Sequence, residues 1–340
     1  MFRKILCVSL AAVFFVTISG CGRNQKLSKT YIEYFDTAVT LIGYDNPGTF
    51  DELAGGVEKI LSKYHKLFDI YNAYDGVNNL YTVNLNAGQK SVTVNSEIIY
   101  FLKFCKEIYQ TTDGETNIAL GSVLKLWHNA RSVAVNEPEK AALPSADELR
   151  VASQHTDIGR LIIDEENDTV FLSDSDASLD VGAVAKGYVA DIIVRYLEEN
   201  DAKHYALNMG GMVSCIGDAD GRPWNVGIID PLDTTTTALT VELSEYSLVT
   251  SGVYQRYFDL NSKRYHHIID PDTLYPEDNF LSVSVLCPEA APGDALSTAL
   301  FNMTLDEGKA LIEKNENISV LWILPDGSLE YGGEFEKHVK

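Results

Sequence analysis

Short apolar segments fill the second half of this 340-residue chain and restrict the folds that it can adopt. Gly, Pro, Asp or Asn separates many of them, a pattern that predicts β-strands. Two segments with helical spacing, 183–199 and 293–315, interrupt the series. Because strands are mixed with separate helices instead of alternating regularly with them, the pattern predicts an α+β fold. The expected strands lie near 158–163, 169–172, 204–209, 224–229, 238–243, 247–250, 256–259, 265–269 and 281–286.

The first half of the chain is predominantly helical by its apolar spacing. Residues 31–44 alternate enough to suggest one strand before the helices. Thr49 and Glu52 fit the capping box of a helix that follows them. The other expected elements are a helix over 97–109 capped by Ser96, a helix running from Asp113-Gly114 toward Trp127, and a charged surface excursion over 129–150.

The N-terminus has the features of an export signal. Arg3 and Lys4 precede an uncharged apolar run over 5–17, which is shorter than the ~20 residues that a spanning helix needs. The run leads into Ile18-Ser19-Gly20-Cys21, which resembles a bacterial lipobox, in which the cysteine thiol carries a diacylglycerol. The alternative is an ordinary signal peptide with a chance cysteine. We therefore expect a lipoprotein signal peptide over 1–20, a tether over 21–30 with Cys21 lipidated, and a domain over 31–340 lipid-anchored on the extracytoplasmic face of the cell membrane.

Acidic residues dominate the composition, with 49 Asp and Glu against 27 Lys and Arg and a net charge of −22. Loss of Arg3 and Lys4 with the signal would leave 25 basic residues and a net charge of −24. Such a surface repels phosphate backbones, so nucleic acid is not an expected partner. An anionic ligand would need local cations or a bound metal ion.

The three remaining cysteines that could be structural are Cys105, Cys215 and Cys287. They are far apart and show no CxxC spacing, so neither a zinc site nor a disulfide framework is indicated. Buried free thiols are the expected state of all three.

Three glycine-containing segments could bind an anionic ligand. Residues 179–187 place glycine and Lys186 at a strand-to-helix junction, where free N–H groups and a cation suit an anion. Gly210-Gly211 follows a strand, and paired glycines permit positive φ and close ligand contact. Residues 250–257 combine hydroxyls, Gly252 and Arg256. Taken alone, residues 179–187 are equally compatible with an ordinary strand–helix junction, Gly210-Gly211 is better explained as a tight turn, and residues 250–257 could form a hairpin turn.

Two further segments carry groups suited to acid–base or metal chemistry. His266-His267 ends an expected strand beside Asp270-Pro271, and an imidazole there can act as a general base. Asp294 and Thr298 are four residues apart and share one helix face, where their oxygens could bind a hard cation such as Mg²⁺. Taken alone, Asp294 is better explained as a helix N-cap.

Five of these segments, in this order, resemble the ApbE family of FAD:protein FMN transferases. The likeness extends from about Tyr34 to about Met303. The matching blocks are LDxGxxAKGY at Leu179–Tyr188, the glycine pair at Gly210-Gly211, TSG-xY-xR at Thr250–Arg256, HIIDP at His267–Pro271, and ADALxTA at Gly293–Ala299.

The resemblance implies an ApbE-like (T-fold-like) flavin transferase fold with mixed, largely antiparallel sheets and flanking helices. It also assigns roles to residues at matching positions. Mg²⁺ would be held by Asp294, Thr298 and the carbonyl of Ala183, and His267 would be the catalytic base. The residues that would contact FAD are Phe35, Glu115, Thr116, Asn117, Asp180, Lys186 and Ile269.

Four positions depart from the family pattern. An aromatic residue and an acid are usual at the positions of Thr116 and Asn117, an acid is usual at Met212, and glycine is usual at Leu274. These differences affect the expected contacts around FAD more than they affect the metal site.

The implied reaction is Mg²⁺-dependent attack of a Thr or Ser hydroxyl of an acceptor protein on FAD, which transfers FMN and releases AMP. The expected partners are FAD, an acceptor protein of an extracytoplasmic redox system, and the membrane through the lipid anchor. Two alternatives remain open at this point: an FAD pyrophosphatase with water as the nucleophile, and a flavin-binding lipoprotein without catalytic activity.

Overall fold

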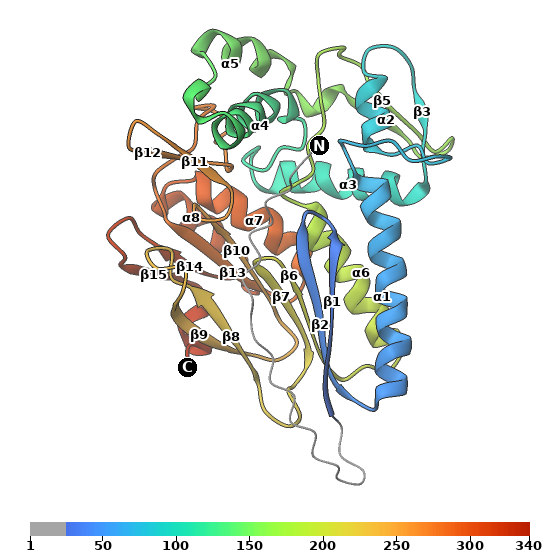
Figure 1. Cartoon of the computed structure of the whole chain (residues 1–340), viewed down its shortest axis with the longest axis vertical. Coiled ribbons are helices and arrows are strands. Elements are labelled where there is room, and N and C mark those ends of the chain that lie inside the picture. Colours follow the sequence, from blue (N-terminus) through green and yellow to red (C-terminus); the bar gives the residue numbers. More distant parts are fainter. Residues whose placement is uncertain (1–24) are drawn as a thin grey trace.

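The computed structural model describes residues 25–340, and its centre is one large sheet of eight strands (Figure 1). Every neighbouring pair in this sheet is antiparallel. The strands, in spatial order, are β1 (Gln25–Tyr34), β2 (Thr37–Asp45), β6 (His204–Met209), β7 (Met212–Gly217), β10 (Ser247–Gly252), β13 (Ser282–Cys287), β14 (Ser319–Ile323) and β15 (Leu329–Gly332).

Helices cover one face of this sheet and a β-hairpin covers the other. Successive residues of one strand therefore belong to different cores: Leu207 packs with the helices, whereas Ala206 packs beneath the hairpin. Both faces are buried, which explains the short, mostly apolar strands of the sequence. The hairpin consists of β8 (Trp224–Ile229) and β9 (Thr237–Leu243). The helices that contact this sheet most extensively are α1 (Pro47–Phe68), α6 (Ala185–Glu199) and α7 (Ala290–Asn302).

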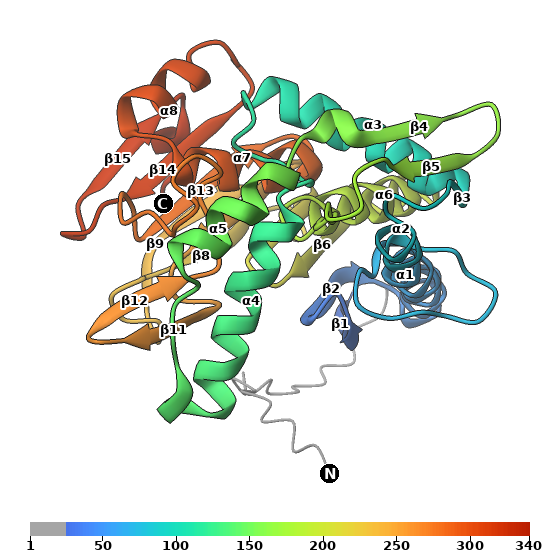
Figure 2. The same ribbon diagram turned by 90° about the horizontal axis from the view of Figure 1, so that it is seen from above.

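Smaller elements lie beyond one end of the large sheet, seen from above in Figure 2. They form a three-stranded sheet, a second hairpin and several helices. Their bounds are β3 (Val92–Thr93), β5 (Thr169–Leu172), β4 (Leu161–Asp164), β11 (Tyr257–Leu260), β12 (Lys263–His266), α2 (Leu80–Leu85), α3 (Ser96–Thr111), α4 (Gly121–Asn136) and α5 (Ala146–Ala152). The remaining elements are α8 (Leu305–Ile312) and the 3₁₀ turns Pro138–Lys140, Ser153–His155, Ile158–Arg160 and Phe335–His338.

The predicted α+β class and the largely antiparallel sheets are confirmed. The predicted tether over 21–30 is wrong for residues 25–30, which form the first part of β1. This segment is polar because β1 is an edge strand whose side chains are mostly exposed, so it lacks the alternation that marks a half-buried strand. Residues 1–24, with the predicted signal and Cys21, lie outside the described part of the chain. Among residues 25–340, no helix combines the length and apolar character required to cross a membrane.

Several predicted helix boundaries are also wrong. The cap of α1 is Asn46, whose side chain accepts a hydrogen bond from the Thr49 amide, and Pro47 occupies the first turn. Asn95 instead of Ser96 caps α3. The helix expected after Gly114 begins only at Gly121, and it continues through the expected surface excursion to Asn136.

The C-terminal helical segment is divided into two helices. The segment expected over 293–315 is α7 followed by α8, with Thr304 and Glu307 forming a capping box at the start of α8. Because α7 begins at Ala290, Asp294 lies inside the helix, and the interpretation of Asp294 as an N-cap is wrong.

Candidate active site

A cavity of about 680 Å³ is lined by residues of α4, α7, the β11–β12 hairpin and the ends of central strands. Its volume is in the usual range for small-molecule and cofactor sites. Each predicted FAD-contacting, metal-binding or catalytic residue lines it. These residues are Phe35, Glu115, Thr116, Asn117, Asp180, Ala183, Lys186, His267, Ile269, Asp294 and Thr298.

The turn between β1 and β2 carries Phe35 into this cavity. Phe35 and Asp36 adopt positive φ angles of 53° and 57°, which are uncommon for residues other than glycine and often occur at functional sites. The Phe35 ring packs edge-on against His65 of α1, with ring centroids 5.7 Å apart. A strained turn therefore holds Phe35 at the cavity.

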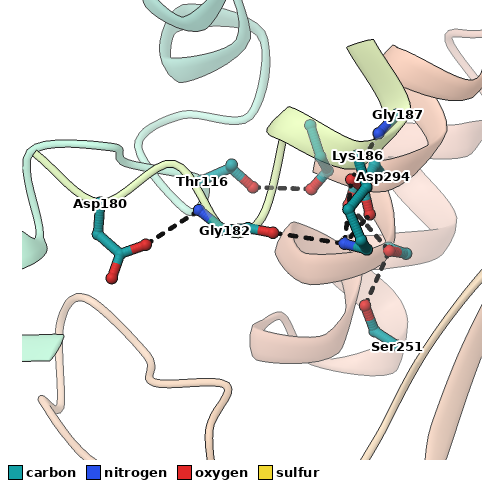
Figure 3. Close-up of polar contacts among 9 residues, drawn as sticks. Thr116, Asp180, Gly182, Lys186, Gly187, Ser251 and Asp294 are labelled. Atoms are coloured by element: carbon teal, nitrogen blue, oxygen red, sulfur yellow. Dashed lines mark hydrogen bonds and ion pairs between the residues drawn. The ribbon is translucent and has the colours of Figure 1, made fainter. Parts of the chain in front are cut away.

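The N-terminal ends of α6 and α7 meet at the cavity through Lys186 and Asp294 (Figure 3). The Lys186 Nζ lies 3.2 and 3.3 Å from the two carboxylate oxygens of Asp294. The Gly187 amide donates to Asp294 Oδ2 at 2.9 Å. Only 6% of the Asp294 side chain is exposed, so this carboxylate is a buried charge held by a cation and a backbone donor.

The oxygen atoms near Lys186 also indicate whether the site fits a hard cation. Its ammonium group contacts the Gly182 carbonyl at 3.4 Å in addition to the Asp294 carboxylate, so oxygen atoms of α7 and of the loop before α6 surround a positive charge. Thr298 and Ala183 line the same cavity. Carboxylate, hydroxyl and carbonyl oxygens are the donors that Mg²⁺ prefers, and the donor set present therefore fits that ion.

The loop before α6 is shaped by Asp180. The carboxylate of Asp180 accepts a hydrogen bond from the Gly182 amide at 2.9 Å, and it lines the cavity. Burial raises the pKa of Asp180, and this hydrogen bond opposes the shift. Asp180 therefore organises the backbone at Gly182, whose carbonyl contacts Lys186.

His267 follows β12 directly and has a ring nitrogen available for chemistry. Its Nδ1 is buried and has no hydrogen-bond partner among the described residues. Burial, followed by the positive charge of Arg256, lowers the pKa of His267 to about 3. Both ring nitrogens of the preceding His266 are hydrogen-bonded, Nε2 to the Glu277 carbonyl and Nδ1 to the Ile268 amide. Burial lowers the pKa of His266 as well, so the two histidines differ in that only His267 has a ring nitrogen free of protein hydrogen bonds among the described residues.

In the segment 115–117, Glu115 has a side-chain oxygen without a hydrogen-bond partner among the described residues, whereas the side chains of Thr116 and Asn117 are hydrogen-bonded. The Glu115 Oε2 is buried without a partner among the described residues, and burial raises the pKa of Glu115 to about 7. Thr116 donates to the Ala295 carbonyl of α7 at 2.8 Å, and Asn117 donates to the Thr156 carbonyl. The two departures from the family pattern at 116 and 117 thus have structural hydrogen bonds of their own.

The other two departures are accommodated in the fold. Met212 is buried in the core beneath the helices. Leu274 retains the positive φ, 65°, that a glycine would adopt more readily. Its side chain packs in the cluster around Trp127, and its carbonyl accepts a hydrogen bond from the Trp127 indole.

Several cavity residues were not expected from the sequence. Tyr71, His128 and Arg131 line the cavity, with the Tyr71 and His128 rings 5.5 Å apart. Burial and the nearby Arg256 lower the pKa of Arg131. The apolar spacing of the expected strands and helices could not identify polar side chains on a loop and on a helix taken for a surface excursion. Clustering of cations in so acidic a chain becomes visible only when the fold brings Arg131 and Arg256 to one cavity.

Burial of Cys105, Cys215 and Cys287 as free thiols is confirmed. These thiols do not line the cavity.

The fold and the cavity together define an α+β protein with an antiparallel core sheet and a ligand-sized site at the junction of two helices. The ApbE family profile matches residues 35–322, and this chain belongs to the ApbE family. The FAD:protein FMN transferase of Klebsiella pneumoniae (strain 342) is 31% identical over 278 residues, covering 80% of this chain and 82% of that protein. The corresponding enzyme of Treponema pallidum (strain Nichols) is 31% identical, with coverages of 81% and 78%.

Solved structures have the same fold. The crystal structure of an ApbE protein from Thermotoga maritima superposes with a TM-score of 0.82 at 25% identity, covering 93% of this chain and 100% of that one. The flavin transferase ApbE of Vibrio cholerae gives a TM-score of 0.77 at 23% identity, covering 93% and 99%. The predicted ApbE-like fold and the family resemblance are therefore confirmed.

Proposed function

We propose that this protein transfers FMN from FAD to a Thr or Ser hydroxyl of an acceptor protein in a Mg²⁺-dependent reaction that releases AMP. One observation carries the proposal: residues from distant segments converge on one ligand-sized cavity around the Lys186–Asp294 pair. The names of the related proteins support the same activity.

The chain's own groups supply the elements of a phosphoryl-type transfer. His267 is neutral and can take the proton of the attacking hydroxyl. Lys186 can offset negative charge on the diphosphate oxygens, and Arg131 and Arg256 bring two further cations to the cavity. The new bond forms between the acceptor oxygen and the FMN-side phosphorus, while the bond from that phosphorus to the bridging oxygen breaks and AMP departs with the electron pair.

A magnesium ion would be held by Asp294, Thr298 and the carbonyl oxygen of Ala183. When bound, the ion would neutralise charge on the transferring phosphoryl group. The buried Asp294 carboxylate is the only one of these three groups with a formal negative charge, so it would contribute most of the electrostatic attraction.

Anchoring to the extracytoplasmic face of the membrane through a lipidated Cys21 is part of the same proposal. Its support is the lipobox-like sequence Ile18-Ser19-Gly20-Cys21, and these residues lie outside the described part of the chain. A membrane-held transferase would act on acceptor proteins of extracytoplasmic redox systems.

Incubation of the purified protein with FAD, Mg²⁺ and an acceptor domain bearing a flavinylation motif tests the activity. Flavin fluorescence should stay with the acceptor after denaturing electrophoresis, and chelation of Mg²⁺ or replacement of the acceptor hydroxyl by Ala should remove it. Asp294→Ala should also abolish transfer. Free FMN without labelled acceptor would support the pyrophosphatase alternative, and intact FAD would support flavin binding without catalysis.

A further inference from the structure

The helices α6 and α7 both begin without a capping side chain of their own. Neither N-cap residue, Val184 for α6 and Glu289 for α7, makes a side-chain hydrogen bond to its first turn. The first backbone N–H groups of a helix have no partner within the helix and need one from elsewhere. Here each helix receives that partner from the other.

The two helices cap each other through a pair of aspartates. Asp191 of α6 accepts hydrogen bonds from the Ala290 and Ala291 amides at 2.7 and 2.8 Å, one on each carboxylate oxygen. Asp294 of α7 accepts one from the Gly187 amide in the first turn of α6. A carboxylate at a helix N-terminus is stabilised by both the N–H groups and the helix dipole.

The contact between the helices is too close to tolerate a side chain at its centre. A Cβ on Gly187 would lie 2.7 Å from the Asp294 Cβ and would collide with the Ala290 carbonyl oxygen. The backbones are thus in direct contact, and small shifts of α7 are transmitted to Asp294 and Thr298.

We propose that Asp191 is a positioning residue, which fixes the first turn of α7 against α6 and thereby sets the spacing of the oxygen ligands on α7 and on the loop before α6. The inference rests on the proposed function, because it concerns the metal site used there. Asp191 itself does not line the cavity, so its effect on a bound ion runs through the position of α7. Outer partners that orient metal ligands commonly influence metal affinity in this way.

The variant Asp191→Asn tests this role with the full-length protein. Asparagine keeps the size of the side chain but has one acceptor oxygen, so one of the two α7 amides loses its partner. We expect Mn²⁺ to bind about tenfold more weakly, measured as free Mn²⁺ by electron paramagnetic resonance. The Mg²⁺ concentration for half-maximal transfer should rise similarly, while kcat at saturating Mg²⁺ stays within about twofold. Asp191→Ala should weaken Mn²⁺ binding further.

Asp164→Asn is the matched control. The Asp164 carboxylate also accepts two backbone N–H groups, those of Glu166 and Asn167 at 3.1 Å, but it belongs to the turn between β4 and β5. It does not line the cavity, so its variant should leave Mn²⁺ affinity unchanged even if it lowers thermal stability.

The outcomes separate the positioning role from the reaction. Wild-type Mn²⁺ affinity in both Asp191 variants would overturn the proposal, as would a wild-type protein that binds no Mn²⁺. If the wild-type protein binds Mn²⁺ but transfers no FMN, the proposed function fails, and the Mn²⁺ affinities of the Asp191 variants still decide on the positioning role.

Discussion

His267 combines an unpartnered ring nitrogen with a pKa held low by burial and by nearby cations. A phosphate-bearing ligand in the cavity would offset the positive charges of Arg256 and Lys186, so the pKa of His267 should rise when FAD binds. The residue would then become a stronger base in the complex than in the free protein.

Replacement of His267 by Ala should therefore reduce kcat by roughly 10²- to 10⁴-fold. The affinity for FAD, measured by the quenching of flavin fluorescence, should change only slightly because other residues supply most contacts. His204→Ala is a suitable control, since His204, on β6, bonds to the carbonyl of Asp218 and does not line the cavity. Full activity of the His267 variant would exclude it as the base.

Glu115 makes stability depend on pH in a defined direction. Because its pKa is raised from 4.5 to about 7, the folded protein retains a proton that the unfolded chain loses between these values, and stability falls as pH rises through this window. Glu115→Gln removes this effect. Allowing for partial exposure, we expect a gain of about 1 kcal/mol, or roughly 2 °C in Tm, at pH 8 and none at pH 4.

Thermal unfolding at the two pH values measures this difference. Glu139→Gln, an exposed change in the turn Pro138–Lys140, is the control and should show no such contrast. A Glu115→Gln variant with equal stability changes at both pH values would contradict the assignment of a raised pKa.

At the scale of elements, the contact between α6 and α7 positions the proposed metal ligands. Gly187→Ala would force the two backbones apart, because a Cβ has no room beside α7. We expect a stability loss of about 1–3 kcal/mol in urea unfolding together with clearly weaker Mn²⁺ binding.

Gly55→Ala on α1 is the matched control for that prediction. A Cβ there would meet no atom within 4 Å, so the helix should gain about 0.5–1 kcal/mol. If Gly187→Ala behaved like Gly55→Ala, the close approach of α6 and α7 would not be required for folding or for metal binding.

Sequence patterns predicted where α6 and α7 lie in the chain but not that the two helices contact each other. The spacing of apolar residues marks each helix, and the motif resemblance marks Lys186 and Asp294 individually. The hydrogen bonds that Asp191 accepts from Ala290 and Ala291 span 99 and 100 residues of sequence, and no local rule pairs such distant groups. The predicted N-caps were wrong for a related reason. Thr49 and Ser96 have side chains suited to capping, but so do Asn46 and Asn95, which are the N-caps in the structure.

At the scale of the whole molecule, the apolar segments predicted the fold class, whereas only the structure revealed the spatial order of the strands in the sheet. The chain folds so that β10 lies between β7 and β13, which brings segments near 180, 250 and 294 to one end of the sheet. The five motifs, taken together as a family resemblance, marked Lys186, His267 and Asp294, and all three line the cavity. Arg131 and Tyr71 escaped prediction because they belong to no such motif.

The proposed anchoring also belongs to the scale of the whole molecule. Cys21→Ser should move the protein from the membrane fraction to the soluble fraction, since the proposed diacylglycerol supplies the apolar surface that holds it. FMN transfer by the purified variant should stay unchanged, because every residue that lines the cavity lies within residues 35–298. Membrane retention of the serine variant would contradict lipidation at Cys21.

The most direct test of the proposed reaction is the ratio of AMP released to FMN bound covalently by the acceptor. Chromatography of the nucleotide and intact mass analysis of the acceptor provide the two amounts from a single incubation with FAD and Mg²⁺. A transferase that uses the cavity described above should give one AMP for each FMN attached, and Asp294→Ala should give neither product. Release of AMP with an unmodified acceptor, or undiminished attachment by Asp294→Ala, would contradict the account.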